Sequence, residues 1–337
     1  MALPPILQDR LRLPVIGSPM FIVSGPELVI AQCKAGVLGA FPALNARPAA
    51  QLDEWICQIV EELAAWDRDH PETPAAPFAV NHISHRTNDR LEHDLEVTCR
   101  RKVPVVITSL GARREVYDAV HASGGLVLHD VISAAHGRNA VEKGADGLIA
   151  VATGAGGHAG ALSPFALVQE LRAFFDGPLV LSGAIADGRA ILAAQAMGAD
   201  LAYIGSAFIA TTEARAADAY KQSIVDSSGE DIVNSNLFTG VHGNYLRASI
   251  IAAGLDPDQL PESDPSKMDF GSGGASAAKA WRDIWGCGQG IGAIHEVIPA
   301  GERVARLAAQ YQAARQELTV KTASFGAMAP VDSLVIL

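Results

Sequence analysis

The chain has few cysteines and no signature of a metal site. Only four of its 337 residues are cysteines, and Cys33, Cys57, Cys99 and Cys287 stand far apart without a Cys-x-x-Cys pair. This spacing argues against a zinc site and a disulfide framework, and it favours a reduced, cytoplasmic setting. There is also no His-Glu-x-x-His segment and no paired Asp/Glu spacing, so we expect no catalytic metal.

Basic clusters and long uninterrupted apolar runs are absent as well. The formal net charge is −11 at pH 7, and charged residues make up 19% of the sequence. We therefore expect neither nucleic acid nor a membrane surface among the partners. The first residues, MALPPILQDRLRLP, lack a basic region followed by an apolar one, so we expect no signal peptide. The most apolar stretches are too interrupted to span a bilayer.

What the sequence does contain is a repeated alternation of short apolar runs and helical patterns, with 49% hydrophobic residues overall. Continuous apolar strands are typical of a parallel sheet covered on both faces. Eight strand–helix units favour a closed (β/α)8 barrel, the TIM barrel, over an open doubly wound sheet, which is the alternative. The eight predicted strands are Pro14–Met20, Val37–Phe41, Pro77–Ile83, Val103–Leu110, Leu126–Val131, Gly147–Thr153, Pro178–Ile185 and Leu201–Ile209.

After the eighth run this rhythm breaks. Residues 214–285 mix helical patterns with a loop rich in Pro, Asp, Ser and Gly, which predicts a mainly helical insertion that caps one end of the barrel. The barrel would then comprise residues 1–213 and 286–320, including a last amphipathic helix over Ala300–Leu318. Residues 321–337 are expected to form a poorly structured tail.

A glycine-rich segment, GAGGHAG (Gly154–Gly160), follows the sixth run. Its four glycines allow a tight turn and a close approach to a flat ligand, because no Cβ intrudes. His158 in its middle is a candidate general base. From this segment alone, a flexible surface turn with an incidental histidine is an equally good interpretation.

Barrel enzymes place their chemistry at the carboxyl ends of the strands, and phosphate groups commonly bind after strands seven and eight. Here the seventh run contains Ser182, Gly183 and Ala184, and the eighth contains Gly205 and Ser206. Small residues expose backbone N–H groups, and the start of a following helix adds the positive end of its dipole. We therefore expect a phosphate group here; the alternative is that both segments are only tight turns.

Three further strand ends are candidates for ligand contact. Ser18, Pro19 and Met20 are uncharged and rigid enough to line a flat apolar ring. The amide of Asn81 both donates and accepts, which suits the edge of a heterocycle. Asp130 either faces the site or caps the helix that follows it, and the sequence leaves the two readings open.

The remaining histidines give weaker signals. His85, His93, His121 and His136 lie in polar or helical patterns, and we expect them to be solvated. His242 in the predicted insertion is a candidate to cap the pocket.

Taken in order, the motifs resemble the nitronate monooxygenase family, formerly called 2-nitropropane dioxygenases, which are flavin enzymes on a TIM barrel. The most specific element is AGGHxG, here Ala155–Gly160. Supporting segments are KAGVLGAF, PFAVN, LSGAIADGRAILAAQAMGAD, YIGSAFIAT and the late GQGIG. The resemblance extends from Pro14 to about Arg315.

The resemblance implies non-covalently bound FMN, with His158 facing the substrate beside it. It assigns the phosphate to one set of residues, Gly183, Ala184, Gly205 and Ser206. It assigns the ring region to Ser18, Pro19, Met20 and Asn81, and closure of the site to Gln289 and Gly290. To these cofactor-binding candidates we add Gly157, Ser182 and Asp130.

The chain departs from the family pattern at three places. Gly17-Ser18 precede Pro19 where many members carry Gln, and Ala184 follows Gly183 where relatives often have a second Gly. Asp130 stands where some members carry Lys, a cation that would stabilise the reduced anionic flavin. The last departure puts the substrate in question more than the cofactor.

The expected function is FMN-dependent oxidation of alkyl nitronates by O₂ to a carbonyl compound and nitrite. With a neutral nitroalkane, His158 would first remove the Cα proton. The first alternative is an NAD(P)H-dependent flavin reductase of quinones or enoyl thioesters on the same scaffold, and the second is a barrel that binds phosphate without flavin. The expected partners are a small-molecule substrate and O₂, with a homodimer as a candidate assembly.

Overall fold

The computed structural model describes residues 3–263, 283–323 and 325. Its central strands are β1 (Val15–Gly17), β2 (Gly39–Pro42), β3 (Phe78–Ile83), β4 (Val105–Ser109), β5 (Leu126–Val131), β6 (Gly147–Val151), β8 (Leu179–Ser182) and β9 (Leu201–Ile204). The helices around them are α2 (Pro26–Ala35), α3 (Gln51–Asp69), α4 (Leu91–Arg100), α5 (Arg114–Ala122), α6 (Ala134–Lys143), α7 (Pro164–Arg172), α8 (Gly188–Met197) and α13 (Ala300–Thr322).

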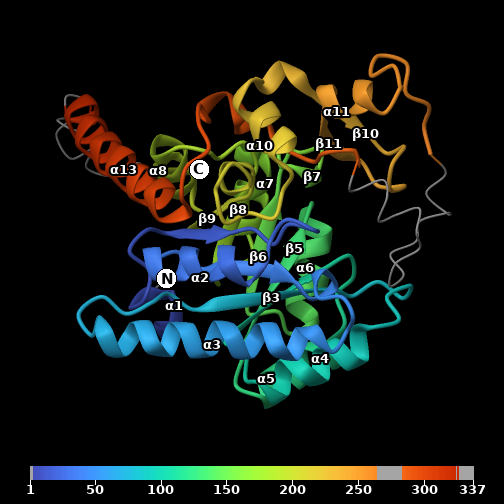
Figure 1. Ribbon diagram of the computed structural model, residues 1–337. Helices are drawn as coiled ribbons and strands as arrows, with labels where there is room; N and C mark the ends of the chain where they lie inside the picture. Colours follow the sequence, from blue (N-terminus) through green and yellow to red (C-terminus); the bar gives the residue numbers. More distant parts are fainter. Residues whose placement is uncertain (1–2, 264–282, 324, 326–337) are drawn as a thin grey trace, which may run out of the picture.

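These strands form one parallel sheet in the order β1-β9-β8-β6-β5-β4-β3-β2 (Figure 1). Its two outer strands meet, because the Gly17 N–H donates to the Leu38 oxygen over 2.7 Å and the Leu38 N–H donates to the Val15 oxygen over 3.1 Å. The sheet therefore closes on itself, and the predicted (β/α)8 barrel is confirmed.

The inside of the barrel changes from apolar to polar along its axis. Side chains alternate between the two faces of a strand, so every second residue points inward. The buried inner cluster includes Leu7, Ile16, Leu38, Ala40, Ala79, Val105, Ile107, Leu128, Ile149, Val180 and Leu201. Leu7 comes from the short helix α1 (Pro5–Gln8), which closes the amino-terminal end. Two residues further along β3, β4 and β5 the same face carries Asn81, Ser109 and Asp130.

The outer helices begin and end where their capping residues dictate. The Ser133 side chain accepts a hydrogen bond from the His136 N–H at the start of α6, and Asp187 accepts one from the Ala190 N–H at the start of α8. These two helices, α6 and α8, end at glycines in the left-handed region, Gly144 with φ of 105° and Gly198 with φ of 110°. Both helices start a few residues beyond the carboxyl end of the strand before them.

The predicted eighth strand is wrong at its carboxyl end. β9 stops at Ile204, and Ser206–Ile209 form the short helix α9. Gly205 already has helical dihedral angles, and its carbonyl oxygen accepts hydrogen bonds from the N–H groups of Phe208 and Ile209. The apolar run continues through this helix because α9 is itself buried, so hydrophobicity alone does not mark where the strand ends.

The insertion contains helices and a small sheet. Its described helices are α10 (Asp218–Val225) and α11 (Arg247–Ala252), with the 3-10 turn η2 (Gly229–Asp231) between them. Two strands that the sequence did not predict, β10 (Ile232–Ser235) and β11 (Gly243–Leu246), pair antiparallel with β7 (Gly157–His158) in the order β10-β11-β7. In Figure 1 these elements lie together above the barrel strands.

Other parts of the sequence prediction extend beyond what the structure describes. Residues 264–282 of the predicted insertion lie outside the described residues, as do 324 and 326–337 of the predicted tail. Along the described part of the chain, no helix is long and apolar enough to span a bilayer.

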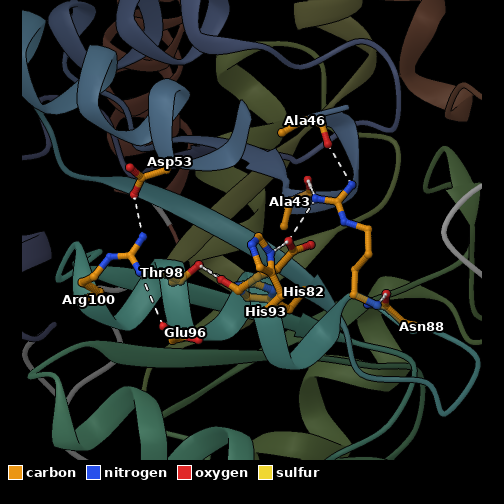
Figure 2. Close-up of polar contacts among 11 residues, drawn as sticks. Ala43, Ala46, Asp53, His82, Asn88, His93, Glu96, Thr98 and Arg100 are labelled. Carbon is orange, nitrogen blue, oxygen red and sulfur yellow. Dashed lines mark hydrogen bonds and ion pairs between the residues drawn. The ribbon is translucent and has the colours of Figure 1, made fainter. Parts of the chain in front are cut away.

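A buried ion pair fastens the loop after β2 to α4. The Arg90 guanidinium donates to Asp94 Oδ1 over 2.9 Å, and it also donates to the Ala46 oxygen over 2.8 Å. Figure 2 shows the carbonyl groups of Ala43 and Ala46, which accept hydrogen bonds from this guanidinium. The Asp94 side chain is only 1% exposed, so its charge depends on this partner. The fastened loop, which includes the 3-10 turn η1 (Ala43–Asn45), forms one wall of the cavity described below.

We predict that Arg90→Ala lowers the free energy of unfolding by about 3–5 kcal/mol, because it removes the guanidinium partner of the buried Asp94 carboxylate and leaves that carboxylate with His93 Nδ1, at 3.1 Å. Urea unfolding followed by circular dichroism measures the change. The matched control is Arg100→Ala, whose ion pair with Asp53 is solvent-exposed and contributes about 1 kcal/mol or less (Figure 2). Equal losses in the two variants would contradict this interpretation.

Candidate active site

A cavity of about 820 Å³ opens at the carboxyl end of the barrel. Its walls come from the ends of the barrel strands, from the segment after β1 and from the insertion. Apolar side chains line most of it, and a few polar groups converge at its floor. This size and composition suit an organic ligand held by a small number of placed polar groups.

Every predicted site residue except Gln289 lines this cavity: Ser18, Pro19, Met20, Asn81, Asp130, Gly157, His158, Ser182, Gly183, Ala184, Gly205, Ser206 and Gly290. Gln289, in the 3-10 turn η4 (Gln289–Ala293), is not among the lining residues. Its backbone N–H donates to the carbonyl oxygen of Gly154 over 2.9 Å, so it helps to position Gly154, which does line the cavity.

Four segments that are distant in sequence meet at the glycine-rich segment. The Gly154 carbonyl oxygen accepts hydrogen bonds from the N–H groups of Ala184, at 3.1 Å, and Gln289, at 2.9 Å. The next carbonyl, that of Ala155, accepts one from the Asn244 side chain over 2.7 Å. The loops after β6 and β8 and the carboxyl-terminal segment are therefore joined by backbone groups, and the Asn244 side chain joins strand β11 to them.

The glycines here make room for another backbone. A Cβ on Gly156 would lie 2.7 Å from the Gly288 nitrogen and within 3 Å of the Cys287 backbone. The sequence predicted clearance for a ligand, but at Gly156 the clearance is filled by the carboxyl-terminal segment. Close backbone packing, and not flexibility, is what requires glycine at this position.

His158 is held in the cavity wall by the small sheet. It pairs with Gly243 of β11, and its Nε2 lies 3.0 Å from the Thr239 hydroxyl oxygen. That hydroxyl donates its own proton to the Val241 carbonyl over 3.0 Å. Nε2 must therefore be the donor toward Thr239, which makes Nδ1 the basic nitrogen of the neutral ring. Burial lowers the pKa of His158 to about 4, so the ring is neutral at pH 7.

The two predicted phosphate loops lie side by side on the cavity wall. Gly183 has φ of 141° and Ala184 has φ of 54°, so both adopt left-handed conformations, which are uncommon for alanine. A Cβ on Gly183 would lie 2.8 Å from the Thr153 oxygen. The Ser206 hydroxyl accepts a hydrogen bond from the Gly288 N–H over 2.9 Å, which leaves its proton available to donate. These features fit an anionic group such as a phosphate.

Three polar residues form the floor of the cavity. The Asn81 side-chain amide donates to the Ser109 hydroxyl over 2.8 Å, and this hydroxyl donates to Asp130 Oδ2 over 2.5 Å. Asp130 is not the cap of α6, because Ser133 has that role. Desolvation by burial raises the pKa of Asp130 to about 7, although the Ser109 hydrogen bond opposes the shift.

Two buried polar atoms at this floor have no partner among the described residues, namely Asp130 Oδ1 and the Tyr203 hydroxyl. Buried polar groups in folded proteins are nearly always hydrogen-bonded, so these two atoms indicate a ligand with polar edges. A flavin heterocycle fits this description. The sequence analysis missed Ser109 and Tyr203, although each lies two residues beyond an inward-facing apolar residue of its strand.

Further residues at the cavity were also missed. Arg47 lines it with its guanidinium 5.1 Å from the Phe21 ring centroid, and burial lowers the pKa of this arginine. His85 and His136, expected to be solvated, also line the cavity, and His136 remains exposed there. His242, the predicted cap, is exposed and is not among the lining residues.

Comparison with known proteins identifies the family of the chain. The family model for nitronate monooxygenase matches residues 6–310. A nitronate monooxygenase from Paraburkholderia phytofirmans is 27% identical over 351 residues, which cover 90% of this chain and 94% of the relative. The solved nitroalkane oxidase from Streptomyces ansochromogenes superposes with a TM-score of 0.78 and 26% identity, over 92% of this chain and 99% of that one.

A mutant of FabK from Thermotoga maritima shares the fold, with a TM-score of 0.75 and 24% identity over 94% of this chain and 97% of that one. The match of the family model over most of the sequence shows that the chain belongs to the nitronate monooxygenase family. It is an enzyme of the oxidoreductase class, and members of this family are flavin enzymes that oxidise nitronates.

We predict that Gly156→Ala destabilises the protein by about 1–3 kcal/mol, because the new methyl group would overlap the Cys287–Gly288 backbone. Thermal unfolding of the purified protein measures the loss. Gly292→Ala, in the adjoining 3-10 turn, meets nothing within 4 Å and serves as the control with little change. An unaltered melting temperature for Gly156→Ala would show that the segments are not tightly packed.

Proposed function

We propose that this protein oxidises alkyl nitronates with O₂ to a carbonyl compound and nitrite, using FMN bound in the cavity. The observation that carries the proposal is the meeting of His158, the polar floor at Asn81 and the two glycine loops around a single cavity. Membership in the nitronate monooxygenase family supports it.

The lining residues suggest how FMN would be held. Its phosphate would bind at Gly183–Ala184 and Gly205–Ser206, where backbone groups and the Ser206 hydroxyl proton face the cavity. Its ring would lie against Pro19 and Met20, with polar edges toward Asn81. When bound, the flavin would supply the redox chemistry by taking electrons from the nitronate and passing them to O₂.

The charge of the cavity suits an anionic substrate. Arg47 contributes positive charge, and Asp130 is the one carboxylate among the lining residues, all of which the structure describes. This contrasts with the net charge of −11 for the whole chain, which would repel an anion elsewhere on the surface. The cavity lining is therefore less acidic than the chain as a whole, which suits an anionic substrate better than the average surface does.

His158 is better suited to a nitronate than to a neutral nitroalkane. Its low pKa keeps Nδ1 unprotonated at neutral pH, but the same burial makes it a weak base. A nitronate is already ionised and needs no proton removed. With a nitroalkane, Nδ1 would have to take the Cα proton, and the buried imidazolium would be costly to form.

We predict that His158→Asn lowers kcat/KM for nitroalkanes by about 10²-fold or more, as expected for the loss of a general base, while nitronates lose less than about 10-fold. Oxygen consumption with nitroethane and with ethyl nitronate gives the two rates. The loss of nitroalkane activity that protonation of His158 causes should appear only as pH approaches about 4. Equal losses on both substrates would rule out the role as base.

The hydrogen bond from His158 to Thr239 provides a matched pair of variants. Thr239→Ser keeps the hydroxyl that fixes Nε2 as the donor, so nitroalkane oxidation should remain near the wild-type rate. Thr239→Val removes it and should reduce nitroalkane oxidation about 10-fold or more, with a smaller effect on nitronates. If both variants behave alike, Thr239 does not orient the imidazole.

The alternative function is an NAD(P)H-dependent reductase on the same scaffold. Anaerobic stopped-flow mixing with NADH, NADPH or ethyl nitronate separates the two, because the true reductant bleaches the flavin rapidly. We expect fast bleaching by the nitronate and slow or no bleaching by either nucleotide. Rapid bleaching by a nucleotide would favour the reductase, and a colourless protein that takes up no FMN would exclude both flavin functions.

A further inference from the structure

Asp130 is a buried carboxyl group for which nitronate oxidation itself gives no role. It lies at an inward position near the end of β5, and its Oδ2 accepts a hydrogen bond of 2.5 Å from Ser109. Its Oδ1 is buried and has no partner in the described chain. The ion pairs of the described residues do not include Asp130, so no Lys or Arg side chain neutralises it there.

The titratable groups around Asp130 do not supply positive charge either. Burial raises the pKa of Tyr203 on β9 and of Tyr117 on α5, and the Asp130 charge adds to the shift of each phenol. His129 points away from the barrel axis, toward Thr108 at 2.7 Å. Burial lowers the pKa values of His129 and His158 to about 4, so both rings are neutral at pH 7.

Two more distant groups complete the surroundings. The Arg47 guanidinium lies over the Phe21 ring in the cavity wall, and its Nε donates to the Leu44 carbonyl over 3.0 Å. His136 lies where the cavity meets solvent. Within the described chain, an ionised Asp130 side chain therefore accepts its hydrogen bond from the Ser109 hydroxyl. This hydroxyl in turn accepts a hydrogen bond from the Asn81 amide, which polarises it.

We propose that Asp130 is the charge-compensating group of this cavity, taking up one proton when an electron enters the bound flavin and releasing it when the electron leaves. The proposal rests on the proposed function, because it requires FMN in the cavity. The electron comes from the nitronate, the proton comes from solvent, and the carboxylate becomes a carboxylic acid. The combined charge of the flavin and Asp130 is then the same before and after the transfer.

The physical reason is repulsion in a medium of low dielectric constant. Two negative charges in a buried site interact far more strongly than in water, and protonation of one removes the repulsion. Burial already raises the pKa of Asp130 to about 7. A negative charge placed nearby raises this pKa further, so it favours binding of the proton.

The first test uses protein without cofactor. Asp130 binds its proton more tightly when folded, so the stability that this proton contributes is complete below about pH 4 and is lost as pH rises toward about 7. The melting temperature of wild type should fall from pH 5 to pH 8 relative to that of Asp130→Asn. Parallel curves for the two proteins would overturn the proposal.

Two variants separate the carboxyl group from its neighbours. Ser109→Ala removes a hydrogen bond that favours the ionised form, so the wild-type decline should move to higher pH. Tyr203→Phe removes the unpartnered hydroxyl but keeps the carboxyl, so the decline should remain. If the decline disappears in Tyr203→Phe, the titration depends on Tyr203 and not on the Asp130 carboxyl alone, and the proposal is overturned.

The second test follows the midpoint potential of bound FMN by spectroelectrochemistry between pH 5 and pH 9. The wild-type potential should fall more steeply with pH than that of Asp130→Asn near and above pH 7, and Asp130→Asn should have the higher potential at pH 8. Equal slopes would overturn the proposal even if nitronate reduces the flavin. Different slopes with no reduction by nitronate would refute only the proposed substrate. A protein that binds no FMN would overturn both proposals.

Discussion

The site depends on one backbone atom, the carbonyl oxygen of Gly154, which accepts hydrogen bonds from both Ala184 and Gln289. These bonds join the loop after β6 to the loop after β8 and to the carboxyl-terminal segment. No side chain takes part, so the contact is insensitive to side-chain identity but intolerant of added volume. Part of the cavity wall is therefore held by hydrogen bonds between backbone groups of loops that are distant in sequence.

The polarity of the barrel interior follows from the same kind of geometric constraint. Alternation places Asn81, Ser109 and Asp130 on the axis above an apolar cluster that excludes water. That cluster gives the floor its low dielectric constant, which raises the pKa of the carboxyl group and strengthens every electrostatic interaction there. The apolar core thus determines how strongly the polar groups of the floor interact with one another and with a ligand.

Much of this could be predicted from the sequence, because eight buried strands leave a strong periodic signal and their carboxyl ends must meet at one edge. This rule predicts from the sequence alone that His158 and the glycine loops lie together, and they do line one cavity. It did not predict β10 and β11, whose short segments IVNS and GNYL are stabilised by pairing with each other and with β7. Contacts such as Thr239 with His158 connect residues 81 apart in sequence and have no local signature.

The pairing of β7 with β11 joins the imidazole of His158 to the insertion through a shared sheet register. The barrel supplies the chain on which this histidine sits, but the insertion sets its angle. A change in the register or length of β11 would therefore move this imidazole as well, although the barrel strands beneath stayed unchanged.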